Sequence, residues 1–146
     1  MSGDVPDPDA LAERFTVCGL SKPEWTHQAH LTVGLWHVSR FGPVRALPML
    51  RARIRRLNDS HGTVNSETSG YHETVTAAYV RLLDQFLAAG YRTLPLRDSC
   101  AALLASPLAD RDVLLRFYSK AVLMSPTARR EWVEPDLALL TLDGWL

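Results

Sequence analysis

The sequence lacks long hydrophobic runs, has only two cysteines and carries no excess of either charge. No apolar stretch approaches the roughly 20 residues that a membrane-spanning helix requires, so we expect no transmembrane segment. The first residues are acidic and contain proline, without the basic and then apolar layout of a signal peptide. Cys18 and Cys100 are isolated, which favours reduced thiols over a disulfide. These absences together predict a cytoplasmic protein.

The charges of the chain balance completely. Lys+Arg and Asp+Glu both number 16, which gives a formal net charge of +0. A neutral chain has no overall electrostatic attraction to nucleic acid or to an anionic membrane, so neither is an expected partner. The length of 146 residues and the 47% hydrophobic content suffice for the core of one soluble domain. We therefore expect a single domain over residues 1–146, with a flexible tail at 1–6 and an apolar C-terminal segment at 137–146.

Signals for β-structure and for phosphate-binding loops are missing as well. No segment alternates apolar and polar residues for any length, no Asn-Gly hairpin turn occurs, and no glycine-rich phosphate loop is present. Apolar residues recur instead with the helical period of about 3.6. The sequence predicts an all-α, single-domain helical bundle of about six to seven helices. The expected helices cover about residues 7–18, 22–41, 44–57, 71–89 and 98–104, then a stretch from about residue 110, and a short one from 125 to 134.

Two histidines share one side of the helix expected over residues 22–41. At about 100° per residue, His27, His30 and Gly34 fall on the same face, with Thr32 roughly opposite. That face also carries Leu31, Val38 and Phe41, so we expect both imidazoles to point toward the core. The glycine on the same face would permit close approach of another helix.

A third histidine lies at the start of the helix expected over residues 71–89. His72 falls within the apolar stripe of that helix, near the azimuth of Tyr79 and Leu83, and Glu73 lies about 100° away at the edge of the stripe. The sequence therefore predicts a second helix that carries an inward-facing imidazole, with a carboxylate beside that imidazole.

These residues together predict a metal site. His27 and His30 are three residues apart and lie on neighbouring ridges of one helix, and His72 supplies a third donor from a facing helix. Three neutral imidazoles fit one transition metal ion, Zn²⁺, Fe²⁺, Cu²⁺ or Ni²⁺. An open fourth position would admit water or a small-molecule substrate, and Glu73 or Glu67 could act as a carboxylate ligand or general base. The first hypothesis is thus a small metal-dependent enzyme, whose chemistry could be hydrolytic, lyase-type or oxidative.

Other interpretations of the histidines remain open. A histidine on an apolar face is usually a core residue that hydrogen-bonds to backbone or carboxylate, and His-x-x-His is a short pattern. The second hypothesis is therefore a non-catalytic helical module that binds a ligand or partner, with structural histidines. A third is metal storage or sensing. His37 either lines the same pocket or lies on the helix flank, and His61 falls in a loop where we expect it to be solvated.

Arginines dominate the outer face of the helix expected over residues 44–57. They are Arg45, Arg51, Arg53, Arg55 and Arg56. Such a face could steer an anionic substrate or phosphate, or it could simply be solvated. The C-terminal segment, which contains Trp145, is expected to pack back onto the bundle or to form a homodimer contact.

The two histidine motifs also carry a resemblance. The segment from Trp25 to Leu31, followed by Tyr71-His72-Glu73-Thr74-Val75-Thr76, resembles an uncharacterised family of small bacterial all-helical proteins with WxHxxHL and YHETxT motifs. The likeness spans about residues 15–90. It implies that His27, His30, His72 and Glu73 belong to one site, and it implies no substrate. The first motif is also faintly similar to that of the DinB-like metal-dependent hydrolases, although their later His-x-x-x-His pair is absent from this sequence.

Overall fold

A computed structural model describes residues 7–145, and every regular element in that range is helical. The predicted all-α fold is therefore confirmed; the tail at residues 1–6 and Leu146 lie outside the described range. The six α-helices are α1 (Pro8–Thr16), α2 (His27–Ser60), α3 (Glu73–Phe86), α4 (Leu96–Leu104), α5 (Lys120–Leu123) and α6 (Pro126–Arg130). Short turns link them: η1 (Lys22–Glu24), η2 (Leu87–Tyr91), η3 (Pro107–Ala109) and η4 (Val113–Arg116). Over residues 7–145, no helix is long and apolar enough to cross a membrane.

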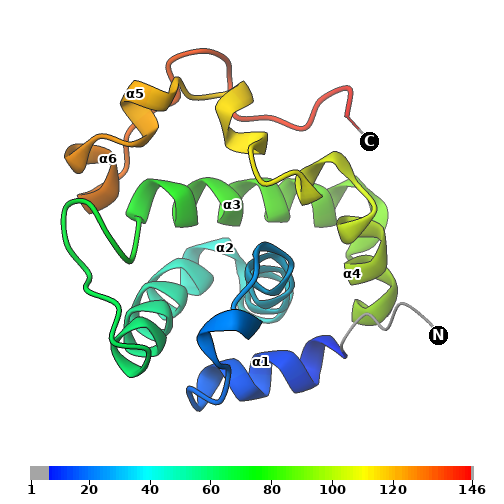
Figure 1. The fold of residues 1–146 in the computed structure, drawn as a ribbon. Helices are drawn as coiled ribbons and strands as arrows, with labels where there is room; N and C mark the ends of the chain where they lie inside the picture. Colours follow the sequence, from blue (N-terminus) through cyan, green and yellow to red (C-terminus); the bar gives the residue numbers. More distant parts are fainter. Residues whose placement is uncertain (1–6, 146) are drawn as a thin grey trace.

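The helices stack in layers around α3 (Figure 1). Helix α1 packs against α2, α2 packs against α3, and α4 closes one end of this stack. Helices α5 and α6, with the C-terminal segment, lie on the other side of α3. Because α3 is covered from both sides, its buried residues include neighbours that point in different directions, such as Leu82 and Leu83. The second histidine motif lies at the start of this central helix, and the first motif, at the start of α2, contacts it through Tyr79.

Helix α2 contains a sharp kink at Gly42. The backbone there has φ +78° and ψ 164°, a conformation that glycine adopts far more readily than other residues. Pro43 follows, has no N–H to donate, and therefore suits the start of a new helical segment. The predicted break between two helices at this position is confirmed, although no loop separates the halves. The second half, residues 43–60, turns away from the first (Figure 1).

The start of α2 differs from the prediction. Residues 22–24 form a separate 3-10 turn, and the helix begins at His27 because the Thr26 hydroxyl accepts a hydrogen bond from the Ala29 N–H at 3.1 Å. His27 and His30 therefore lie in the first helical turn, where His27 is half-buried and His30 is exposed. The expectation that both rings point into the core is thus wrong for His30.

The first half of α2 is buried on almost every side. Thr32, expected opposite the core, is only 3% exposed, because α4 covers that position: the Thr32 Oγ1 lies 3.5 Å from the Cys100 Sγ of α4. Gly34 faces α3 as predicted: a Cβ at this position would lie 2.9 Å from the Leu83 Cδ1. The missing side chain therefore lets α2 and α3 approach closely.

Helix α3 is shorter at both ends than predicted. It begins at Glu73, so His72 is not within the helix but is its N-cap residue, with extended backbone at φ −130° and ψ 109°. It ends at Phe86, and the chain continues as a π turn in which Gly90 has φ +126°. The expected placement of His72 on the apolar stripe is therefore wrong, because a capping residue does not follow the helical azimuth.

The chain after α3 is more irregular than predicted. Helix α4 begins at Leu96 instead of residue 98 or 99, and a single helix from residue 110 does not form. Two short elements replace it because the Ser119 hydroxyl accepts from the Val122 N–H and thereby starts α5 anew. Val113 is buried as expected, whereas Ala121 is exposed.

The C-terminal segment packs back onto the bundle, in agreement with one of the two predicted placements. Trp145 stacks on Phe117 with ring centroids 5.3 Å apart, and Leu142 is buried. Leu137 and Leu139 remain exposed. Helix α6 starts after Ser125 as predicted but ends at Arg130.

Candidate functional site

Three of the five histidines are bound to backbone carbonyl groups. The His37 Nδ1 lies 2.7 Å from the Val33 oxygen, the His61 Nε2 lies 2.7 Å from the Leu20 oxygen, and the His72 Nε2 lies 2.6 Å from the Leu123 oxygen. A ring nitrogen that donates to a carbonyl fixes the tautomer and cannot at the same time bind a metal ion. These three rings tie separate elements of the fold together.

His72 uses both of its ring nitrogens. The Nδ1 accepts from the Val75 N–H at 3.2 Å and so caps α3, while Nε2–H donates to Leu123 at the end of α5. The ring is neutral in this arrangement, and burial lowers its pKa. The structure thus places His72 as a link between α3 and α5.

Glu73 is held in a bidentate ion pair with Arg51 of α2. The Arg51 Nε and Nη2 donate to the two carboxylate oxygens at 2.8 and 2.7 Å, and the Tyr71 hydroxyl donates to Oε1 at 2.7 Å. Burial alone would raise the pKa of Glu73, but these hydrogen bonds outweigh it and leave that pKa below its usual range. The carboxylate is therefore a poor general base where it stands.

Thr74 completes the motif with two more bonds to distant backbone. Its hydroxyl donates to the Glu131 oxygen at 2.8 Å and accepts from the Val133 N–H at 3.1 Å. Tyr71, His72, Glu73 and Thr74 therefore connect α3 to the second half of α2, to α5 and to the chain after α6. We call these four residues the 71–74 clamp.

His37 is the most deeply buried of the five histidines. It is 0% exposed, and its Nε2 accepts a hydrogen bond from the Arg53 Nη1 at 2.8 Å while its Nδ1 donates to Val33. Burial, aided by the charge of Arg53 and opposed by the hydrogen bond to Val33, lowers the pKa of His37 to about 4. His37 is therefore a neutral core residue; it belongs neither to a pocket nor to an exposed helix flank.

His27 differs from these rings because one buried nitrogen has no partner. Its Nε2 is inaccessible to solvent and makes no hydrogen bond to any residue in the range 7–145. The ring packs edge-on against Tyr79 of α3, with centroids 5.9 Å apart. Burial lowers the pKa of His27, a backbone hydrogen bond between the ring and Leu108 opposes that shift, and the charges of Arg111 and Asp110 lower and raise the pKa respectively. No contact at Nε2 itself meets hydrogen-bond geometry within residues 7–145, so the unpartnered atom is this one nitrogen and not the whole ring. The result is a neutral imidazole with a free lone pair or N–H.

His30 lies one turn further along α2 and is accessible from solvent. Its ring packs edge-on against the Trp25 indole, with centroids 3.9 Å apart. Surrounding protein atoms, and then the charge of His27, lower the pKa of His30 to about 4, although the residue as a whole is exposed. Whether a ligand can reach the His30 ring depends on the exposure of the residue and not on the size of this pKa shift. His27 is a half-buried residue whose Nε2 is buried, and His30 is an exposed residue whose ring packs on Trp25. We call these two residues the histidine pair.

The predicted site residues thus separate into two groups. The clamp residue His72 lies seven positions before Tyr79, which is about 10 Å along the axis of α3. Its ring is directed to α5, whereas Tyr79 is the α3 residue in contact with His27. Within residues 7–145, no group of three or more His, Cys, Asp or Glu side chains is arranged to hold a metal ion. Glu67, the other predicted carboxylate, is exposed and pairs with Arg130 at 3.1 Å.

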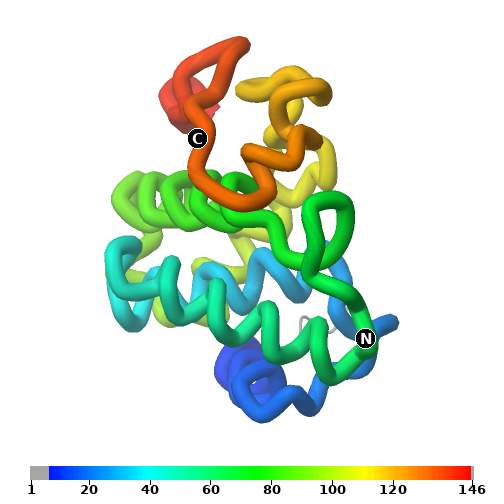
Figure 2. The backbone as a smooth tube through the Cα atoms, turned by 90° about the vertical axis from the view of Figure 1, so that its left-hand side faces the viewer, coloured from blue at the N-terminus to red at the C-terminus, as the bar shows by residue number. Residues whose placement is uncertain are grey.

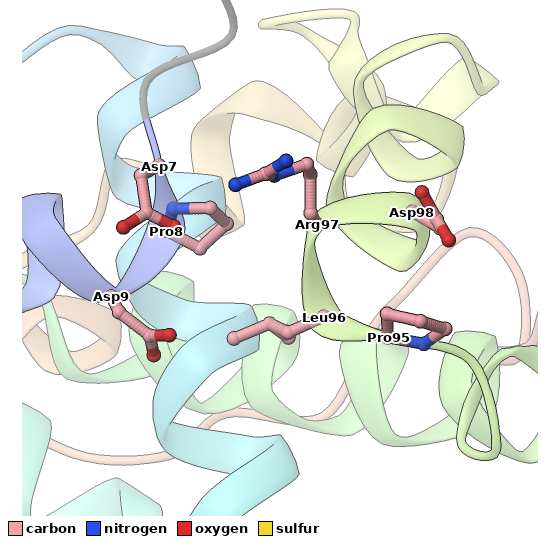
Figure 3. Close-up of a pocket in the computed structure, with 7 residues that line it drawn as sticks. All are labelled: Asp7, Pro8, Asp9, Pro95, Leu96, Arg97 and Asp98. Atoms are coloured by element: carbon pink, nitrogen blue, oxygen red, sulfur yellow. The ribbon is translucent and has the colours of Figure 1, made fainter.

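Two surface hollows lie apart from both groups. One, of about 350 Å³, is formed where α1 and α4 begin, and in Figure 3 the Arg97 side chain extends toward Asp7 and Pro8 while Asp98 points away. The second, of about 410 Å³, is bordered by α1 together with Trp36 and Arg40 of α2. Neither hollow is lined by a histidine.

Several neighbours of the histidine pair are not recognisable from the sequence. From the sequence pattern, Tyr79 is one more member of an apolar stripe, and Asp110 marks the expected start of a helix. Both reach His27 only through the tertiary fold, as does Arg111. No spacing pattern links these positions, so only the fold could identify them.

Comparisons with known proteins do not add to this geometry: no family model matches the chain, and no curated protein or solved structure is significantly similar to it. The resemblance to small bacterial helical proteins therefore stays a prediction. Any functional conclusion rests on the contacts described above.

Proposed function

We propose that the protein is a small helical binding module, which receives its ligand at the histidine pair, while the 71–74 clamp holds the fold. One observation carries this proposal: the buried His27 Nε2 has no hydrogen-bond partner in the described part of the chain. A buried polar atom without a partner costs about 1–3 kcal/mol. Such a cost is expected where a ligand or a bound water completes the bonding.

The surroundings of His27 indicate the kind of ligand. The ring is kept neutral by its lowered pKa, so it can present a lone pair to a hydrogen-bond donor or to a transition metal ion. Tyr79 packs its ring against His27, and His30 on the same helical turn offers a second imidazole. Asp110 and Arg111 bring charges of both signs to the same place. A small polar ligand, or a metal ion with its own water, fits these groups.

Binding is favoured over catalysis by the state of the clamp. The carboxylate predicted as the general base, Glu73, is engaged by Arg51 and Tyr71, and the predicted third ligand, His72, is engaged at both nitrogens. A catalytic role would require these bonds to break. The metal-dependent enzyme remains a second candidate, and the free Nε2 of His27 beside His30 is the feature that favours it.

A test of both candidates compares three variants: His27→Phe, His30→Ala and His72→Asn. Elemental analysis of the purified protein and titration with Zn²⁺ are followed by long-range ¹H–¹⁵N spectra of the imidazole rings. The same spectra are recorded with a fragment library of small amines and alcohols. The asparagine at position 72 retains a capping side chain, so the fold is expected to survive.

The expected result is that Zn²⁺ or a fragment shifts the His27 ring signals, that His27→Phe abolishes the effect, and that His72→Asn retains it. Equal loss of metal in His27→Phe and His72→Asn, with the fold intact, would instead establish the three-histidine metal centre and refute the binding module. His27 signals that respond to neither Zn²⁺ nor any fragment would refute both.

A further inference from the structure

The neutral total charge of the chain conceals a strong local separation. Residues 40–58 contain six arginines and no Asp or Glu. Residues 131–143 contain four acidic residues and no Lys or Arg. The six arginines are Arg40, Arg45, Arg51, Arg53, Arg55 and Arg56. An electrostatic field depends on where charges lie, so the zero sum does not determine what this part of α2 attracts.

Most of these arginines have no carboxylate partner. Arg51 is paired with Glu73, but none of the other five forms an ion pair within residues 7–145. Three of them lie over aromatic rings: the guanidinium of Arg40 is 5.0 Å from the Trp36 ring centre, that of Arg45 is 5.3 Å from Phe41, and that of Arg55 is 5.0 Å from Tyr71. Arg53 is oriented by its bond to His37. These contacts hold the guanidinium groups in place. None of these four arginines pairs with a carboxylate in the described chain, although the charge of Arg55 acts on Glu73 and helps to lower the pKa of that carboxyl.

The second half of α2 lies on the outside of the molecule. Figure 2 views this side directly, and the helix runs across the front in cyan and green without another segment in front of it. Arg45, Arg55 and Arg56 are exposed, and Arg53 is partly exposed. Arg45 and Arg56 are separated by about three turns, or roughly 16 Å along the axis, and share one side of the helix. Arg53 and Arg55 lie about 80° to either side of those two, next to His37 and Tyr71 respectively. The four residues Arg45, Arg53, Arg55 and Arg56, which we call the arginine face, therefore wrap around roughly half of the helix circumference.

The chemistry of this face distinguishes between classes of partner. Protein interfaces have an apolar core, often with aromatic residues, whereas nucleic-acid interfaces are more polar and much more positive. The exposed or partly exposed side chains between the arginines on this side are Pro48, Met49 and Ala52, none of them aromatic; the half-buried Phe41 and the exposed Val44 adjoin Arg45 only at the start of this helical segment. Arginine also matches phosphate oxygens through its planar fork of donors. Single strands are bound by stacking on exposed aromatic rings, and the Tyr71 ring at this face is buried.

We propose that the arginine face of α2 binds the phosphate backbone of a nucleic-acid duplex. The contact reads the charge and spacing of the phosphates, which the planar guanidinium groups match. Asp59 lies at the end of the same helix, where its Oδ1 accepts from the Asn65 Nδ2 at 3.2 Å, and it limits the face on that side. This inference is independent of the ligand at the histidine pair.

The test is fluorescence anisotropy of a labelled mixed-sequence DNA duplex, of about two helical turns, at 50 and 200 mM salt. With three to four phosphate contacts, counterion release predicts that affinity falls roughly 40- to 150-fold between these two salt concentrations. The Arg45→Gln/Arg55→Gln/Arg56→Gln variant is expected to lose at least tenfold in affinity at the lower salt concentration and to show a flatter salt dependence. Its matched control, Lys22→Gln/Arg97→Gln/Lys120→Gln, removes three exposed cations elsewhere and is expected to stay within about threefold of the parent.

Parallel titrations with a polyglutamate peptide and with phosphatidylserine-containing vesicles decide between polyanions. Stronger binding of either one than of the duplex would overturn the assignment, as would equal losses in the two triple variants or no duplex binding at 50 mM salt. Because Arg55 packs on Tyr71, the double variant Arg45→Gln/Arg56→Gln is measured as well, with circular dichroism as the check of folding. That variant leaves the contact between Arg55 and Tyr71 intact, and an affinity within threefold of the parent would also count against the proposal.

Discussion

The 71–74 clamp and the histidine pair contain the same kinds of side chain, yet they differ in what those side chains already bind. In the clamp, the His72 ring makes bonds at both nitrogens, the Glu73 carboxylate receives three hydrogen bonds, and the Thr74 hydroxyl both donates and accepts. In the histidine pair, His27 has a buried nitrogen without a partner in the described chain, and His30 is open to solvent.

This difference teaches how to separate structural from functional polar residues. A saturated cluster stabilises the fold and leaves nothing for a ligand, whereas an unsaturated buried atom lowers stability until something binds to it. Substitutions should therefore act in opposite directions in the two regions. Four substitutions or titrations test that expectation.

The largest effect is expected for Glu73→Ala. It removes both bonds to Arg51 and leaves the buried Tyr71 hydroxyl without its acceptor, which should lower the free energy of unfolding by about 3 kcal/mol. Urea denaturation measures the change. The control is Glu67→Ala, whose exposed pair with Arg130 should contribute less than about 1 kcal/mol. Similar effects of the two variants would show that the clamp is not the structural centre described here.

The next effect concerns His37, a further structural histidine, and its response to pH. The pKa of His37 in the folded state is about 4, below its ordinary value of 6.5, so the unfolded chain binds more protons between those two pH values. This contribution to stability is complete above pH 6.5 and is lost as pH falls toward 4, by about 3 kcal/mol at most. Urea denaturation at several pH values should give a shallower pH dependence in His37→Gln. An unchanged slope would mean that other groups carry the acid sensitivity.

A smaller effect is expected at His72, where two substitutions separate its two bonds. His72→Ala removes the cap of α3 and the donor to Leu123, and should cost about 2 kcal/mol. His72→Asn can still cap the helix and should cost about 1 kcal/mol. Thermal melts followed by circular dichroism report both values. If neither substitution changes stability, the ring is not a structural link, and a role in ligand binding becomes the better explanation.

Much of the fold was predictable because it depends on local signals. The break at Gly42-Pro43 follows from the backbone freedom of glycine and the missing N–H of proline. The close approach at Gly34 follows from its missing side chain, and the restart at Ser125 follows from a serine cap. The start of α3 was not predictable in the same way. A histidine can occupy a helix interior or cap it, and its bond to Leu123 decides between the two through a contact 51 residues away.

The candidate site was predictable only in part, for the same reason. The spacing of His27 and His30 correctly places both rings in one helical turn, but the exposure of His30 depends on how Trp25 and α1 pack around it. The prediction that His72 shares a site with His27 and His30 assumed that rings facing inward from two helices lie next to each other. In the structure α3 is covered on two sides, so two inward directions exist, and His27 and His72 point to different neighbours.

The smallest expected change in stability is the one that best separates the two regions. His27→Phe keeps an aromatic ring of similar shape against Tyr79 and removes the unpartnered nitrogen, so the free energy of unfolding should stay the same or rise by up to about 1 kcal/mol. His30→Ala, an exposed position, should change it by less than about 0.5 kcal/mol and serves as the control. Urea denaturation without any ligand measures both. A loss of 2 kcal/mol or more in His27→Phe would place His27 among the structural histidines. A loss of that size would mean that the imidazole already makes a stabilising hydrogen bond in the folded protein.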